Sequence, residues 1–305
     1  MKLVFMGTPE FAVPSLIKLH KSSHNIVTVV TGPDKRRGRG KDLSPTPVKK
    51  TALELGLPVL EVLDLKSEEF YNKLESLQPD LFVVVAFRIL SKRVLAIPKT
   101  GSINLHASLL PKYRGAAPIH WAVVNGDAET GCSIFFLSEE VDGGKILLQR
   151  KTPIGMMENT GEVYDRLKDL GSDLLAEAVD RIASGSYELQ EQDERQSTPA
   201  PKVFNEDAFI DFRAKALEVH NRIRGMNPFP GAWTTIDGNR LKLLRARPAD
   251  SEPVSTGNVD IVDGSVIVGC GSGTLELLDV QMQGRSPMKA IDFFNGYRGN
   301  HALGA

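Results

Sequence analysis

The sequence feature that most constrains the fold is the uninterrupted apolar run Leu81-Phe82-Val83-Val84-Val85. A strand with no polar residue on either face is usually covered on both faces, which is typical of parallel sheets between layers of helices. Other short apolar runs alternate with segments of helical periodicity: the runs are 3–6, 26–30 and 58–60, and the helical segments are 11–19, 51–55 and 70–77. This alternation predicts a Rossmann-like open α/β sheet, mainly parallel, with helices on both faces and ligands at the carboxyl ends of its strands.

A change in composition indicates a second, smaller domain. Residues 160–182 have the period of one long amphipathic helix, and a polar segment without periodicity follows them. Beyond it come short strand-like runs and two hairpin signals, Asp237-Gly238 and Asp263-Gly264. We therefore predict a first domain over 1–189, a linker over 190–205 and a small OB-type β-barrel over 206–305.

Charge and composition exclude several classes of protein. The chain has 37 Lys and Arg against 38 Asp and Glu, a net charge of -1, so an anionic partner must be met by a local basic patch. Two cysteines cannot build a disulfide framework or a cysteine-rich zinc site. No apolar run approaches the ~20 residues that span a bilayer. We expect a monomeric, cytoplasmic protein with no metal and no membrane partner.

The turn after the first predicted strand, Gly7-Thr8-Pro9-Glu10-Phe11, contains a single glycine. A dinucleotide-binding fingerprint needs Gly-x-Gly-x-x-Gly at that place, and here a carboxylate stands where a pyrophosphate would approach. The turn therefore argues against a nicotinamide or flavin cofactor.

Three polar side chains occur near the ends of predicted strands. Asn104 and His106 alternate along the run 102–106, so they point to the same face, and Asp142 lies in a polar loop after another strand. An amide can donate to a developing oxyanion, and an imidazole can exchange a proton near neutral pH. From spacing alone, an acid–base and oxyanion site and a set of purely structural polar groups are both open.

Longer motifs favour the first interpretation. The run 104–111 (NLHASLLP), with 114–119 (RGAAPI) and 142–144 (DGG), resembles the 10-formyltetrahydrofolate-dependent formyltransferases. Four more blocks are similar to the members of that family that act on tRNA: 7–11 (GTPEF), 38–41 (GRGK), 45–49 (PTPVK) and 227–233 (NPFPGAW). The resemblance covers nearly the whole chain, and it implies transfer of the formyl group of 10-formyltetrahydrofolate to the α-amine of methionyl initiator tRNA.

The resemblance also implies roles for single residues. Asn104, His106 and Asp142 match the family's catalytic positions, with the first two at the oxyanion and Asp142 orienting His106 and assisting proton removal. The expected folate contacts form two stretches, Phe87, Arg88, Ile89, Leu90 and Ser108, Leu109, Leu110, Pro111. Most relatives have Gly and Pro where Arg88 and Ser91 stand here, so the loop that frames the pterin departs from the family pattern.

Two basic segments are candidates for binding tRNA. Residues 34–50 carry seven basic against two acidic side chains and three glycines lie in or beside them, and composition alone allows either a phosphate-binding loop or a solvated surface loop. The resemblance implies tRNA contacts there, with Arg39 foremost among Lys35, Arg36, Arg37, Arg39 and Lys41. A second stripe, Arg240, Lys242 and Arg245, is expected to follow the tRNA backbone, with an ordinary charged strand face as the alternative.

Three other functions stay open. A glycinamide ribonucleotide formyltransferase would share the Asn/His/Asp site but lack the barrel, and a formyltransferase acting on a sugar-nucleotide amine would have a suitable length. The basic loop and the 227–231 block favour tRNA over both. A catalytically inactive RNA-binding protein is the third, and the presence of Asn104, His106 and Asp142 together argues against it.

Overall fold

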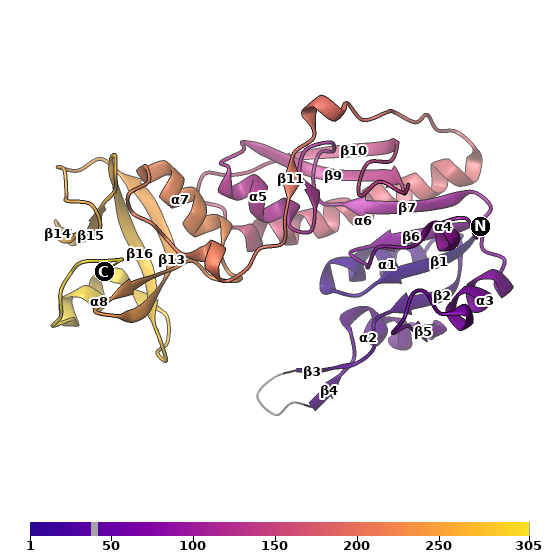
Figure 1. Ribbon diagram of the computed structural model, residues 1–305, viewed down its shortest axis with the longest axis horizontal. Helices are drawn as coiled ribbons and strands as arrows, with labels where there is room; N and C mark the ends of the chain where they lie inside the picture. The colour runs from indigo at the N-terminus through magenta and orange to yellow at the C-terminus, as the bar shows by residue number, and fades with distance from the viewer. Residues whose placement is uncertain (38–41, 305) are drawn as a thin grey trace. The chain divides into compact units, whose positions relative to one another are not determined.

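The computed structural model describes residues 1–37 and 42–304 (Figure 1). Its internal contacts divide the chain into two units. The first comprises Met1–Gly115, Gly131–Thr152 and Tyr164–Pro199, and the second comprises Ala116–Thr130, Pro153–Val163 and Ala200–Ala305. The contiguous domains expected from the sequence, 1–189 and 206–305 with a linker between them, stay a prediction.

The first unit contains the sheet that the apolar runs predict. Its seven strands lie in the order β10-β9-β7-β6-β1-β2-β5. Their bounds are β1 Lys2–Gly7, β2 Asn25–Thr31, β5 Val59–Glu61, β6 Leu81–Val85, β7 Gly101–His106, β9 Glu129–Phe136 and β10 Ile146–Pro153. The pairs β2–β5, β1–β2, β1–β6 and β6–β7 are parallel, and β7–β9 is antiparallel. The open, mainly parallel sheet is thus confirmed, and all five residues of β6 are buried.

The other elements that lie wholly or partly in this unit are α1 Val13–His20, α2 Pro47–Glu54, α3 Glu68–Ser76, α4 Lys92–Leu95, α6 Thr160–Ser184, β3 Lys35–Arg37, β4 Asp42–Ser44, β8 Arg114–Gly115, β11 Pro199–Ala200 and 3-10 turns at Glu10–Ala12 and Glu194–Gln196. On one face, Phe82 and Val84 of β6 share an apolar cluster with Leu74 of α3. On the other face Leu105 of β7 lies against α6, where a Cβ at Gly171 would come within 2.9 Å of its methyl groups. Since neighbours along a strand face opposite ways, Asn104 and His106 point to the α3 side.

The second unit contains an antiparallel sheet in the order β12-β13-β16-β15-β14, with β17 paired to β16. Its elements are α5 Pro118–Val124, a 3-10 turn Glu206–Ala208, α7 Ala216–Gly225, β12 Trp233–Ile236, β13 Asn239–Ala249, β14 Val259–Val262, β15 Ser265–Gly269, β16 Thr274–Met282, β17 Met288–Lys289 and α8 Ala290–Gly296. The C-terminal segment joins the two sheet edges, because Leu303 bridges to Ile236 and Ala302 to Asn258. This closed arrangement is the small barrel that the strand spacing predicts.

Both hairpin signals are confirmed. Asp237, Gly238, Asp263 and Gly264 all have positive φ angles, between 46° and 76°. They connect β12 to β13 and β14 to β15, which are antiparallel pairs. Two positive φ angles in a two-residue loop give the turn whose twist matches that of the flanking strands.

The sequence did not predict the strand β10, the helices α4, α5 and α8, or the short strands β3, β4, β8, β11 and β17. The run 115–118 (GAAP) favours a turn, yet Pro118 is the first residue of α5, a position where its missing N–H and fixed φ are tolerated. In the parts of the chain that the structure describes, none of the helices has the length and apolar character needed to cross a bilayer.

Candidate active site

Asn104 and His106 lie in the second half of β7, toward the carboxyl end of the parallel strands. Asn104 is half-buried, paired in register with Val84 and Phe135, and its side-chain amide has no hydrogen bond to any described residue. His106 is 6% exposed, and its ring meets that of Phe135 edge-on with centroids 6.5 Å apart. An amide without a partner next to a fixed imidazole leaves a hydrogen-bond donor available to a ligand.

The hydrogen bonds of His106 decide which of its nitrogens can do chemistry. Nε2 lies 2.8 Å from the main-chain oxygen of Tyr113. Since a carbonyl oxygen can only accept, Nε2 carries a hydrogen and Nδ1 is left for proton transfer. Nδ1 lies 3.7 Å from Oδ2 of Asp142, which is longer than a hydrogen bond. The carboxylate is therefore placed to stabilise positive charge on the imidazole, while the Tyr113 carbonyl fixes the ring.

The loop that carries Asp142 has an unusual backbone. Asp142 has a φ of 54°, and its Oδ2 accepts a hydrogen bond from the main-chain N–H of Gly115 at 2.9 Å. At Gly144 a Cβ would lie 1.7 Å from the carbonyl oxygen of Phe136, so only glycine allows the loop to return this close to β9. The Asp-Gly-Gly run is thus explained by the close approach that aims the carboxylate at His106.

The stretch Ser108–Pro111 is fixed by a buried hydroxyl that sequence reasoning missed. Ser133 of β9 donates to the carbonyl of Ser108 at 2.7 Å and accepts from the N–H of Leu110 at 3.0 Å. Gln149 of β10 donates to both the Leu110 carbonyl and the Ser133 hydroxyl, at 2.9 and 2.8 Å. Ser133 is a polar residue directly before the apolar run Ile134-Phe135-Phe136, and this is the sequence signal that could have identified the clamp that these hydrogen bonds form.

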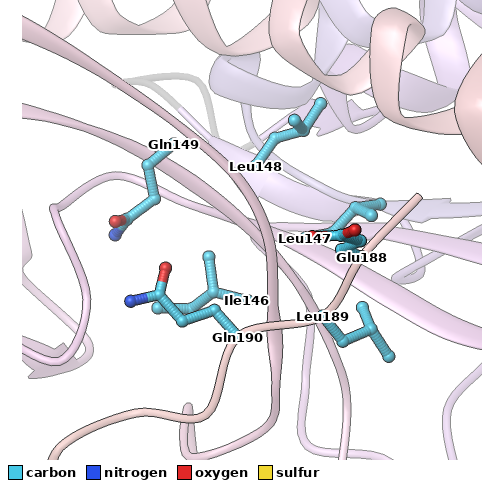
Figure 2. A pocket seen from close by; sticks show the side chains of 7 residues that line it. All are labelled: Ile146, Leu147, Leu148, Gln149, Glu188, Leu189 and Gln190. Atoms are coloured by element: carbon cyan, nitrogen blue, oxygen red, sulfur yellow. The ribbon is translucent and has the colours of Figure 1, made fainter.

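A hollow of about 470 Å³ adjoins the clamp (Figure 2). It is lined by residues of β10 and of the segment that follows α6: Ile146, Leu147, Leu148, Gln149, Glu188, Leu189 and Gln190. Asn104, His106 and Asp142 are not among its lining residues, so the hollow lies outside the three-residue site.

The loop Phe87–Leu90 follows β6 and therefore lies at the same sheet edge as the end of β7. Leu90 is buried with the core, whereas Ile89 is 78% exposed. The Arg88 guanidinium donates to the carbonyls of Val62 and Leu63 and lies 5.4 Å from the centre of the Phe87 ring. Arg88 thus uses its charge to hold the neighbouring loop after β5.

Ser91, the second departure from the family pattern, begins α4. Its hydroxyl accepts a hydrogen bond from the N–H of Val94 at 3.4 Å. A serine at this position satisfies one of the free N–H groups of the first helical turn, which is the usual role of an N-cap. The substitution therefore has a local structural reason.

The basic segment 34–50 is described only in part. Lys35, Arg36 and Arg37 form β3, paired antiparallel with β4, while Arg39 and Lys41 lie outside the described residues. At the base of the hairpin, Lys49 donates to Asp34 and Glu61 at 2.8 and 2.7 Å. These bonds raise the pKa of Lys49 and occupy its ammonium group.

The stripe Arg240, Lys242 and Arg245 lies on β13, where its residues alternate with buried ones. A shift in register after Leu243 places Arg245 on the same face as the other two. Arg240 donates to Asn205 at 2.8 Å and lies 4.3 Å above the Trp233 ring. Within 1–37 and 42–304, Lys242 and Arg245 have no acidic partner. The structure thus brings the three basic residues to one face and leaves two of them available to an anion.

A metal centre finds no support among the described residues, where no three His, Cys, Asp or Glu side chains are grouped to hold an ion. The site instead combines a free amide, an imidazole and a carboxylate at the carboxyl edge of the sheet. All three residues belong to the first unit.

Comparison with known proteins identifies the family to which the chain is similar. Residues 1–179 match the family described as formyl transferase, and residues 202–298 match its C-terminal domain. The methionyl-tRNA formyltransferase of Moorella thermoacetica is 46% identical over 300 residues, covering 97% of this chain and 96% of that protein. The one from Chlorobium luteolum is 45% identical over 305 residues, covering 98% and 97%.

A solved structure shows the same fold at lower identity. The sugar 3N-formyl transferase WlaRD, crystallised in the presence of dTDP and 5-N-formyl-THF, superposes with a TM-score of 0.69 at 20% identity, covering 94% of this chain and 99% of that chain. The match to the family over more than half of the chain, together with full-length relatives at 45–46% identity, shows that the chain belongs to the methionyl-tRNA formyltransferase family of formyl transferases.

Proposed function

We propose that this chain transfers the formyl group of 10-formyltetrahydrofolate to the α-amino group of methionyl initiator tRNA. One observation carries the chemistry: at the end of β7 the unpartnered amide of Asn104 shares a face with His106, whose Nδ1 lies 3.7 Å from the Asp142 carboxylate. The full-length relatives, which are methionyl-tRNA formyltransferases, supply the substrate class.

The attacking amine needs little activation. An α-amino group has a pKa of about 7.7–8.0, so a substantial fraction is already the neutral nucleophile near neutral pH. The protein must instead stabilise the negative charge that develops on the formyl oxygen. We assign the Asn104 amide to that oxygen, because it has no competing partner among residues 1–37 and 42–304. One such donor is worth about 2.7–4 kcal/mol of barrier.

Proton transfer falls to His106 and Asp142. The amine must lose one proton as the new C–N bond forms, and the leaving nitrogen must gain one as the old bond breaks. Nδ1 of His106 can accept and return this proton, since Nε2 is held by Tyr113. Asp142, whose Oδ2 is fixed by Gly115, stabilises the imidazolium and, through a water, assists removal of the amine proton.

The residues present fit a folate co-substrate, which supplies the formyl group. Ser133 and Gln149 fix the backbone of Ser108–Pro111, and Arg88 fixes the loop Phe87–Leu90. The exposed Ile89 side chain offers an apolar surface to a flat ring beside this rim. We therefore assign the co-substrate to these two stretches.

The tRNA is assigned to the two basic segments. Lys242 and Arg245 stand on one strand face without acidic partners in the described chain, which is the arrangement that backbone phosphates require. The loop with Lys35, Arg36, Arg37, Arg39 and Lys41 is assigned to the same substrate from the sequence. A monomer acting in the cytoplasm also stays our prediction, to be checked by sedimentation and by localisation.

The test compares amine acceptors side by side. Purified protein with 10-formyltetrahydrofolate is offered methionine-charged initiator tRNA, free methionine, glycinamide ribonucleotide and an amino-sugar nucleotide, and formylated product is measured. We expect product with the charged tRNA alone, and loss of it in His106→Ala. Preferred formylation of another acceptor would refute the substrate, and activity of His106→Ala within about threefold of wild type would refute the role of His106.

A further inference from the structure

Residues 190–198, here called the strap, contact the active-site loops of the first unit. The side-chain amide of Gln192 donates two hydrogen bonds, to the carbonyl of Asp142 at 2.8 Å and to that of Gly144 at 2.7 Å. These two carbonyls flank the turn that aims the Asp142 carboxylate at His106. One side chain of the strap thus holds both ends of that turn.

Gln192 is itself held by a buried charge. Its Oε1 accepts from the guanidinium of Arg114 at 2.8 and 3.2 Å. Arg114 is 10% exposed and forms a two-bond ion pair with Glu194 of the strap, at 2.6 and 2.9 Å, and a further bond to Glu140. Because both amide hydrogens and the amide oxygen of Gln192 have partners, its orientation is fixed.

Thr198 of the strap contacts the segment that holds His106. Its hydroxyl accepts a hydrogen bond from the N–H of Tyr113 at 2.9 Å, and its carbonyl accepts one from the N–H of Arg114 at 2.8 Å. The carbonyl of Tyr113 is the group that receives the Nε2 hydrogen of His106. The strap therefore reaches His106 through Tyr113, as it reaches Asp142 through Gln192.

The two residues that the strap holds share a backbone property. Tyr113 and Asp142 have φ angles of 62° and 54°, in the left-handed region that non-glycine residues rarely adopt. Such conformations persist only where surrounding contacts impose them, and they cluster where geometry matters for function. Besides the strap, the Asp142–Gly115 hydrogen bond and the Arg114–Glu140 ion pair hold this turn from the side of Arg114.

We infer that Gln192 and Thr198 are positioning residues of the active site, and that the strap sets the distance between the His106 imidazole and the Asp142 carboxylate. The inference deepens the proposed function and rests on it for its kinetic test. The strap, whose composition is that of a linker, would thus position catalytic groups.

The first experiment replaces Gln192 in the full chain. Gln192→Met removes all four hydrogen bonds of the side chain. Gln192→Glu keeps the acceptor for Arg114 but has no amide hydrogens for the two carbonyls. We expect kcat to fall on the order of tenfold in both variants, with both KM values within about twofold of wild type. The matched control is Gln196→Ala in the same strap, because Gln196 is exposed and, in the part of the chain that the structure describes, its side chain donates to Asp193 alone.

The second experiment separates the hydrogen bond of the Thr198 hydroxyl from the volume of its side chain. Thr198→Val keeps the volume and the main-chain bonds but cannot accept from Tyr113, whereas Thr198→Ser retains the acceptor. We expect kcat to fall severalfold in the valine variant and to recover in the serine variant. Equal kcat in both, or wild-type kcat in the two Gln192 variants, would overturn the inference.

A third measurement does not depend on turnover. Hydrogen–deuterium exchange of a peptide covering 138–144 should speed up in Gln192→Met and stay unchanged in Gln196→Ala, while the melting temperatures remain alike. Unchanged exchange in Gln192→Met would overturn the positioning role even if the wild-type protein formylated a different amine. Wild-type inactivity on charged initiator tRNA with faster exchange in the variant would refute only the proposed function.

Discussion

Two asparagines with opposite surroundings give a sharp test of the site. Asn104 is half-buried and has no side-chain partner among the described residues, so Asn104→Ala removes nothing that supports the fold. If its amide binds the developing oxyanion, the variant loses about 2.7–4 kcal/mol of transition-state stabilisation, or about 100- to 1000-fold in kcat. Its free energy of unfolding should change by less than about 1 kcal/mol.

Asn227 is the matched control. It is 4% exposed, and its amide donates to the carbonyls of Ile223 at 2.7 Å and Leu243 at 2.8 Å. Asn227→Ala leaves two buried carbonyls without these donors, which costs about 2–4 kcal/mol of stability. This variant should therefore melt at a lower temperature and keep its kcat at temperatures where it is folded.

The assay is steady-state formylation of charged initiator tRNA, paired with thermal unfolding of each variant. The expected result is a crossed pattern, in which Asn104→Ala loses kcat and Asn227→Ala loses stability. If Asn104→Ala kept kcat within about threefold of wild type, the oxyanion assignment would be wrong. Equal losses of stability in both variants would show that the Asn104 amide has a structural partner instead.

Four further predictions follow from the same contacts. Asp142→Asn should slow kcat by at least about tenfold, because an amide cannot stabilise the imidazolium; an unchanged rate–pH profile in this variant would contradict that role. Ser133→Ala should raise the KM for the folate more than that for tRNA, since the Ser108–Pro111 backbone loses its clamp; steady-state titration of each substrate checks this. Arg245→Ala should raise the tRNA KM and lower its salt dependence more than Arg247→Ala does, because Arg247 already donates to Glu276 at 2.6 Å; the reverse order would refute the assignment. Burial raises the pKa of the Cys132 thiol to about 12, so it should resist alkylation at about pH 8 in the folded chain and react once the chain is unfolded.

Much of the site's local geometry was predictable because it depends on neighbours in the sequence. Asn104 and His106 share a face since they are two residues apart on one strand, and that holds in any sheet. The hairpins at Asp237 and Asp263 are equally local, since their turn chemistry decides the φ angles. Asp142 was a candidate because its loop follows a predicted strand, and the motif resemblance assigned it to His106.

The groups that hold the site were not predictable in this way. Ser133 and Gln149 fix the folate stretch, and Gln192 and Thr198 hold the loops of Asp142 and Tyr113, yet none belongs to a recognisable motif. Each uses a polar side chain to satisfy a backbone group that lies far away in the chain. Such partners exist only after packing has brought the segments together.

Sequence periodicity was sufficient for the alternation of strands and helices, for the buried parallel strand Leu81–Val85 and for the shared face of Asn104 and His106. The tertiary structure decided that Tyr113 fixes the imidazole, that Asp142 stops 3.7 Å from it, and that a polar strap holds both. The physical reason is that periodicity and turn preference act between sequence neighbours, whereas a hydrogen bond over about 3 Å depends on where packing places two distant backbones.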